Sequence, residues 1–231
     1  MEIDLNCDLG EGAGADSAVM PFITSANVAC AFHAGSAVEM RQTIAMAKHL
    51  NVVVGAHPGH RDPEHFGRRE LSIEPAQVYV ETVYQIGALL SVARIEQAAV
   101  RYVKPHGGLY HQVNRDDAYA DTMIEAARLF GLMVMGLPRS RLEERARGRC
   151  PFVAEGFADR RYRPDGSLVP RDQPGAFIDD PIEAVMQVQR LIAEQGIRTI
   201  CVHGDNPKAI QFVQTLRDAL LQQKFQIRPF A

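Results

Sequence analysis

Histidine and carboxylate side chains follow directly on several short apolar runs of this chain. The histidines are His33, His57, His106 and His203, and the carboxylates are Asp8, Glu11 and Asp205. A glycine lies within two residues of each, and glycine allows the backbone to approach a ligand closely. Imidazoles combined with carboxylates suit a divalent metal ion, or general acid–base chemistry on a water molecule.

Other catalytic signatures are absent from the sequence. Cys7 and Cys30 lie near the same segments, but no neighbouring residue marks either thiol as activated. The zinc motif H-E-x-x-H, the P-loop and a G-x-G-x-x-G turn between a strand and a helix are also missing. The residues therefore indicate a hydrolase or a lyase that acts on a small polar molecule.

Short apolar runs alternate with longer helical patterns along the whole chain. The runs are typical of strands buried on both faces of a parallel sheet. They cover residues 3–6, 27–30, 52–56, 102–104, 133–136, 152–154 and 199–202. Such alternation predicts successive β-α-β units, and a closed or nearly closed α/β barrel is favoured over an open doubly wound sheet.

Helix boundaries are marked by capping residues. Ser36 and Glu39 form a capping box, and Asp180 precedes a proline at the first helical position. Asn206 precedes Pro207 in the same way. Helices are expected over residues 36–50, 75–98, 116–130, 181–195 and 207–220.

The carboxyl ends of parallel strands share one rim, where α/β proteins build their sites. The histidines and carboxylates named above are therefore expected to converge there. Lys104, at the end of the fourth run, could pair with a substrate carboxylate or with Asp8. Arg68 and Arg69 could bind an anion or lie in a solvated turn.

The whole chain, residues 1–231, is expected to form a single α/β barrel domain. Residues 156–179 lack a helical period, and Pro164 to Gly166 form a turn signal, so a hairpin excursion is expected there. A connection of this length inside a compact domain is typical of a functional loop or a lid.

Composition excludes several classes of protein. Of 231 residues, 46% are hydrophobic and 23% are charged, which is an ordinary globular balance. The net charge of −3 argues against a nucleic-acid binder. No apolar run approaches the roughly 20 residues of a membrane span. Four scattered cysteines and the lack of a signal peptide predict a cytoplasmic protein.

Seven ordered blocks of sequence resemble the LamB/YcsF family, to which the A subunit of bacterial 5-oxoprolinase belongs. The blocks are DLNCDLGEG at 4–12, SANVAC at 25–30 with FHAG at 32–35, GAHP at 55–58, FGRR at 66–69, VKPHG at 103–107, EGFADR at 155–160 and VHGD at 202–205. The resemblance implies an incomplete α/β barrel of about seven strands, a TIM-like fold similar to polysaccharide deacetylases. It also implies ATP-dependent opening of 5-oxoproline (pyroglutamate) to L-glutamate, together with subunits B and C.

The resemblance also suggests roles for individual residues. Asp8 or Glu11 would act as the base, and His57 or His106 as the acid or oxyanion donor. Lys104 or Arg69 would hold the substrate carboxylate. The other residues expected to bind substrate are Asn6, His33, Glu155, His203 and Asp205. For a divalent metal, the candidate ligands are Asp8, His57 and His106.

The sequence departs from the usual family pattern at Ala31, Ser36, Gly59, His60 and His111, several of them at the rim. Two alternatives therefore stay open. One is a metal-dependent deacetylase or amidohydrolase acting on a small amide or sugar, and the other is a non-catalytic subunit that binds lactams. Homo-oligomerisation and the subunit that binds ATP also stay open.

Overall fold

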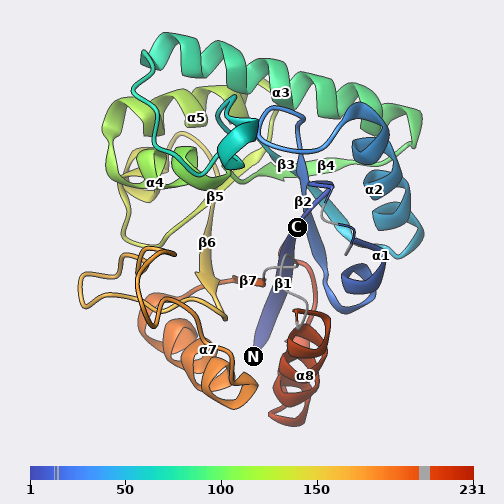
Figure 1. The fold of residues 1–231 in the computed structure, drawn as a ribbon, viewed down its shortest axis with the longest axis vertical. Helices are drawn as coiled ribbons and strands as arrows, with labels where there is room; N and C mark the ends of the chain where they lie inside the picture. The colour runs from blue at the N-terminus through green and yellow to red at the C-terminus, as the bar shows by residue number, and fades with distance from the viewer. Residues whose placement is uncertain (13, 15, 203–208) are drawn as a thin grey trace.

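Parallel strands form a closed barrel with helices around it (Figure 1). The computed structural model describes residues 1–12, 14, 16–202 and 209–231. Its strands are β1 (Glu2–Leu9), β2 (Ser25–Ala29), β3 (Val53–His57), β4 (Val100–Val103), β5 (Met133–Gly136), β6 (Phe152–Phe157), β7 (Thr199–Val202) and β8 (Gln226–Ile227). Strands β1 to β7 pair in sequence order around the ring, and β8 pairs with β1 outside it.

The predicted seven-stranded, TIM-like α/β barrel is confirmed. Its ring is hydrogen-bonded all the way round, because β1 pairs with β2 on one side and with β7 on the other. The barrel is thus incomplete only in having one strand fewer than the eight of a full TIM barrel. The open doubly wound sheet, the alternative from the sequence, is wrong for the same reason.

Helices fill the connections between strands. They are α1 (Asp16–Val19), α2 (Ala37–His49), α3 (Pro75–Ile95), α4 (Gly107–Arg115), α5 (Asp117–Leu129), α6 (Arg141–Ala146), α7 (Pro181–Gln195) and α8 (Ala209–Gln222). The predicted caps at Ser36 and Asp180 accept backbone hydrogen bonds from their helices. The predicted start at Asn206 and Pro207 lies outside the described residues. Within the described chain, no helix is both long and apolar enough to cross a membrane.

The excursion expected over residues 156–179 is a hairpin. β6 takes its first two residues, and two antiparallel bridges follow, one joining Arg160 to Phe177 and one joining Tyr162 to Leu168. The side chain of Gln187, on α7, donates to the carbonyls of Phe157 and Arg160. The base of the hairpin is therefore attached to the barrel.

The barrel interior is polar next to β1. Alternate β1 residues point inward because strand side chains have a period of two. Asp4 and Asn6 are buried, and Asn27 donates to both Asn6 and Asp8 at 2.7 Å. The Tyr102 hydroxyl donates to Asn27 at 2.6 Å. This hydrogen-bonded chain fixes the direction in which Asp8 points at the rim.

Asp4 lies at the opposite end of this chain, where it accepts hydrogen bonds from the hydroxyls of Thr24, Ser25 and Thr199. Burial raises the pKa of Asp4 to about 6, although the hydroxyls act in the other direction. The folded chain therefore binds an extra proton between about pH 4 and pH 6. The stability that this proton provides is complete below about pH 4 and is lost as the pH rises through about 6.

We expect the ionisation of Asp4 to lower the free energy of unfolding by roughly 2 kcal/mol between pH 4 and pH 7. Asp4→Asn should lack this dependence. Urea denaturation of both proteins across the range gives a difference curve in which other groups cancel. Asp172→Asn, which removes an exposed carboxylate, is the control, and a flat difference curve for Asp4→Asn would contradict the assignment.

Candidate active site at the carboxyl ends of the strands

Consecutive strands bring most of the predicted site residues to the carboxyl end of the barrel. Asp8 lies near the end of β1 and His57 is the last residue of β3. Glu11 and His33 lie just beyond β1 and β2. Lys104 and His106 follow β4, and Glu155 lies within β6. His203 and Asp205 lie outside the described residues.

Four of these residues form a compact cluster whose donor atoms all lie within 4.8 Å of one another: Glu11, His33, His57 and His106. Glu11 Oε1 lies 3.3 Å from His33 Nε2, 3.3 Å from His106 Nδ1 and 3.8 Å from His57 Nε2. The rings of His33 and His106 stack with centroids 3.9 Å apart. We call these four residues the Glu–His cluster.

Backbone carbonyls orient two imidazoles of the Glu–His cluster. His57 Nδ1 donates to Lys104 O at 2.7 Å, and His106 Nε2 donates to Phe66 O at 2.8 Å. A neutral imidazole that donates from one nitrogen has a lone pair on the other. His57 Nε2 and His106 Nδ1 face each other at 2.9 Å, so a proton or a cation belongs between them. Carbonyls that orient imidazoles in this way are typical of metal sites.

Glycines make room for the third imidazole of the cluster. A side chain at Gly59 would come within 2.6 Å of His33 Nδ1, and one at Gly67 within 2.6 Å of His33 Cβ. Gly59 is one of the positions where the sequence departs from the usual family pattern. The departure therefore leaves space for the ring of His33.

The protonation states follow from burial and from neighbouring charges. Burial lowers the pKa of His33 to about 3 and also lowers the pKa of His106. Burial alone would lower the pKa of His57 too, but the carboxylate of Asp8 outweighs it and raises this pKa. Burial would raise the pKa of Glu11, but its contacts with the imidazoles of His106 and His33 outweigh burial and hold this pKa well below its usual range.

The structure fits a divalent metal ion at the Glu–His cluster. One carboxylate and two neutral imidazoles are ready ligands at neutral pH, and His57 offers a third imidazole. Asp8, a predicted ligand, lies beside the cluster rather than in it. Its Oδ2 is 3.3 Å from His57 Nε2, and its Oδ1 accepts from Lys104 and Asn27.

Lys104 is a buried ammonium held by several partners. Its Nζ lies 2.9 Å from Asp8 Oδ1, 2.8 Å from Glu155 Oε1 and 3.1 Å from Cys201 Sγ. Burial lowers the pKa of Lys104, but Asp8 and the other anionic groups around it outweigh this effect and keep the pKa well above its usual value. Lys104 is therefore a cation at every physiological pH. The sequence predicted that Lys104 pairs with a substrate carboxylate or with Asp8, and in the structure Lys104 pairs with Asp8.

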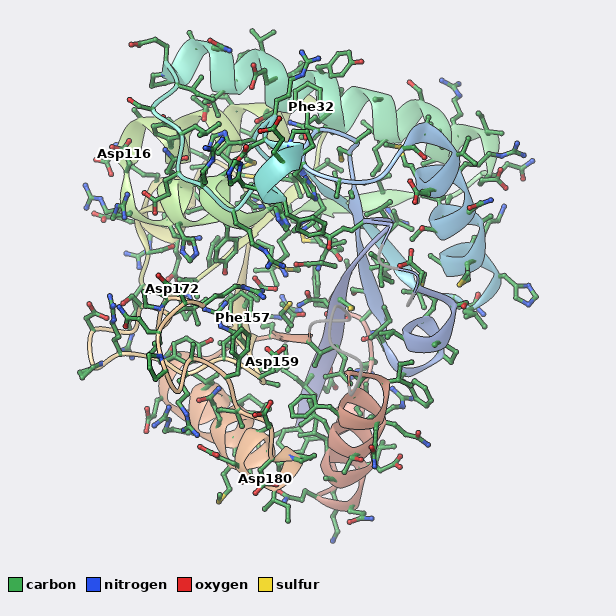
Figure 2. The ribbon with its side chains drawn as sticks, in the orientation of Figure 1. Phe32, Asp116, Phe157, Asp159, Asp172 and Asp180 are labelled. Atoms are coloured by element: carbon green, nitrogen blue, oxygen red, sulfur yellow. The ribbon has the colours of Figure 1, made fainter. Side chains whose placement is uncertain are left out.

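A cavity of about 1330 Å³ opens above these residues. Asp8, His57, Lys104 and His106 line it, and Tyr110 and Phe157 line it as well. The hairpin covers another wall. Figure 2 shows Phe157 near the middle of the molecule and Asp172 on the hairpin. The cavity is thus lined both by the reactive side chains and by the hairpin, the segment for which the sequence predicted a functional loop or a lid.

Other predicted residues do not line the cavity. Asn6 is buried beneath it, where its amide donates to Thr199 and its carbonyl oxygen accepts from Asn27 and Lys104. Arg69 makes two hydrogen bonds to Asp62, and its side chain is 54% exposed. Arg69, which was predicted to hold the substrate carboxylate, is thus paired with Asp62 away from the cavity.

Sequence reasoning missed residues on and beside α4. Tyr110 lines the cavity from this helix, which was not predicted. The spacing of Leu109 and Val113, both buried, is the signal that could have revealed the helix. His60 and His111, two positions where the sequence departs from the family pattern, were not missed: His60 is buried against Gln112, and His111 lines the cavity.

Comparison with solved structures defines the class of fold. A family 4 carbohydrate esterase from Streptomyces lividans matches with a TM-score of 0.55 at 12% identity, covering 100% of this chain and 93% of its own. A peptidoglycan N-acetylglucosamine deacetylase domain from Eubacterium rectale matches with a TM-score of 0.55 at 10% identity, covering 99% and 88%. The chain thus has the α/β barrel fold of the polysaccharide deacetylases.

The family follows from a closer likeness. A lactam utilization protein from Thermus thermophilus is 38% identical, with a TM-score of 0.91 and 100% coverage of both chains. Residues 3–231 match the LamB/YcsF family. The chain belongs to the LamB/YcsF family, as its sequence motifs predicted.

Proposed function

We propose that this chain is the A subunit of an ATP-dependent 5-oxoprolinase, which opens 5-oxoproline to L-glutamate together with subunits B and C. Family membership and the likeness to a lactam utilization protein support a lactam as substrate. The observation that carries the proposal is the pairing of Asp8 with His57 on the cavity wall, where Asp8 Oδ2 lies 3.3 Å from His57 Nε2. This pair offers a base and an acid to one bound molecule.

The ring opening needs both members of this pair. A lactam is a resonance-stabilised amide, and transfer of the ATP γ-phosphoryl group to its oxygen would make the carbonyl carbon electrophilic. Asp8 takes a proton from water as the water oxygen bonds to that carbon. His57 gives a proton to the ring nitrogen as the carbon–nitrogen bond breaks. A second water then releases phosphate and leaves L-glutamate.

The test is glutamate formation from 5-oxoproline, with and without ATP, by this chain alone and combined with subunits B and C. We expect turnover only when all subunits and ATP are present. No turnover in any combination, with the chain folded as judged by circular dichroism, would overturn the proposal.

The Glu–His cluster favours a second candidate, a metal-dependent amide hydrolase. A divalent ion bound there would polarise a carbonyl group and lower the pKa of water. Glu11 and His33 would hold the ion, and His57 and His106 would complete the set. Amide hydrolysis that requires metal but not ATP would favour this candidate over the first.

We expect the chain to bind one divalent ion, such as Zn²⁺, at this cluster. His33→Ala removes a ligand and should weaken Zn²⁺ binding by more than the roughly 10- to 100-fold that loss of an outer-shell partner produces. Isothermal titration after dialysis against a chelator measures the change. His65→Ala is the control, because His65 is half-exposed and contacts Asp62 instead. Equal Zn²⁺ affinity in both variants would contradict the site.

A further inference from the structure

The proposed substrate carries a carboxylate, and the site needs a cation with donors left to bind it. Lys104 and Arg69 were the predicted cations. Lys104 is surrounded by the carboxylates of Asp8 and Glu155, and Arg69 is paired with Asp62. The arginines that line the cavity are the other cations that a substrate acid can meet.

Arg160, at the base of the hairpin, meets this requirement. Its side chain lines the cavity, although the residue is only 3% exposed. Nη2 donates to Val169 O at 2.6 Å, and the guanidinium carbon lies 5.3 Å from the ring centroid of Phe177. Nε has no hydrogen-bond partner, and within the described parts of the chain no carboxylate forms an ion pair with this side chain.

A buried guanidinium in this state favours an anion. Burial lowers the pKa of Arg160 to about 10, so the group is still a cation at neutral pH, and the charges of Arg171 and Asp159 act on this pKa in opposite directions. A buried guanidinium without a paired carboxylate is unfavourable, and a bound anion would supply the missing counter-charge. The planar guanidinium also matches the two oxygens of a carboxylate through parallel N–H donors.

The surrounding chain holds Arg160 in place. Gln187 Nε2 donates to the backbone carbonyl of Arg160 at 2.7 Å, and the neighbouring Arg161 forms an ion pair with Glu183. Together with the hydrogen bond from Nη2 to Val169 O, this contact of the Arg160 backbone holds the residue on the cavity wall.

We propose that Arg160 binds the carboxylate of the substrate and so selects lactams that carry an acid over neutral lactams. The inference rests on the proposed function, because it assigns the recognition of the substrate acid in that same site. Arg160 is a binding residue here, and the proton transfers stay with Asp8 and His57.

The test compares 5-oxoproline with 2-pyrrolidinone, the same lactam ring without the carboxylate. Turnover by the complex with subunits B and C, and direct binding to the chain by calorimetry, are measured for both. We expect Arg160→Gln to lower kcat/KM for 5-oxoproline by roughly 10- to 100-fold and to leave 2-pyrrolidinone unchanged. Arg160→Lys keeps the charge and should recover part of the loss. Arg163→Gln, which changes an exposed arginine of the same hairpin, is the control.

A structural role for Arg160 gives a different pattern. Arg160→Gln would then lower the values for both lactams equally, and this result would overturn the inference. If Arg160→Gln does not fold, the wild type and Arg160→Lys are compared instead. The inference is overturned if the wild type has equal kcat/KM for the two lactams. It is also overturned if Arg160→Lys keeps the wild-type ratio of kcat/KM for 5-oxoproline to kcat/KM for 2-pyrrolidinone. A wild-type complex that turns over neither lactam overturns the proposed function itself.

Discussion

Asp8→Asn is expected to lower the turnover of 5-oxoproline by about 10²- to 10⁴-fold, the range typical of a lost general base. Asparagine keeps the size of the side chain and an oxygen that can accept from Lys104 and Asn27. It cannot take a proton from water, and it removes the carboxylate that raises the pKa of His57. Both the base and the acid are therefore impaired. Glutamate release by the complex with subunits B and C measures the effect.

The control for Asp8→Asn is Asp172→Asn, which changes a carboxylate on the part of the hairpin that lines the same cavity. We expect full turnover from this control. Affinity for 5-oxoproline should change only a few-fold in Asp8→Asn, because the proposed carboxylate contact lies elsewhere. Full turnover in Asp8→Asn would remove the role of Asp8. Turnover lost in step with the melting temperature would indicate a structural role.

The second large effect concerns stability. Lys104→Met is expected to lower the free energy of unfolding by about 3–5 kcal/mol, the range for breaking a buried ion pair from one side. Glu155 is 0% exposed, and the Lys104 ammonium is the cation next to it at 2.8 Å. Its removal leaves the carboxylates of Glu155 and Asp8 without this counter-charge. Equilibrium denaturation in urea measures the loss.

Two further variants separate charge from packing. Lys48→Met replaces an exposed lysine and should change stability by no more than about 0.5 kcal/mol. Adding Glu155→Gln to Lys104→Met removes one stranded carboxylate and should recover part of the stability. If the double variant is no more stable than Lys104→Met, the buried charge of Glu155 is not the cause.

Much of the fold could be predicted from the sequence because it depends on local pattern. Continuous apolar runs marked all seven barrel strands, and Ser36 and Asp180 marked helix starts. The α4 helix was missed because it begins at the glycine after His106, without a capping side chain. Closure of the ring also lay beyond local pattern, since it depends on how β1 pairs with the distant β7.

The candidate site shows the same division. Strand ends placed Asp8, His57 and His106 at one rim in the sequence analysis, and the structure brings them together there. Glu11 and His33 were expected at the same rim, but the predicted metal ligands were Asp8, His57 and His106. Only the structure places Glu11 and His33 in the Glu–His cluster with Asp8 beside it, because no local pattern sets the direction of the loops that carry them. Arg69 looked like an anion binder, but its loop turns it toward Asp62.

The sequence by itself determined the family, the order of strands and helices, and the rim at which polar side chains collect. These properties depend on residue type and on spacing within one segment. Only the tertiary structure decided which donors face one another, that Lys104 is held by Asp8 and Glu155, and that Nε of Arg160 has no hydrogen-bond partner among the described residues. The reason is physical. Side-chain direction at the rim depends on the register of strands far apart in the chain, such as Cys7 beside Val202, and on burial that no single segment specifies.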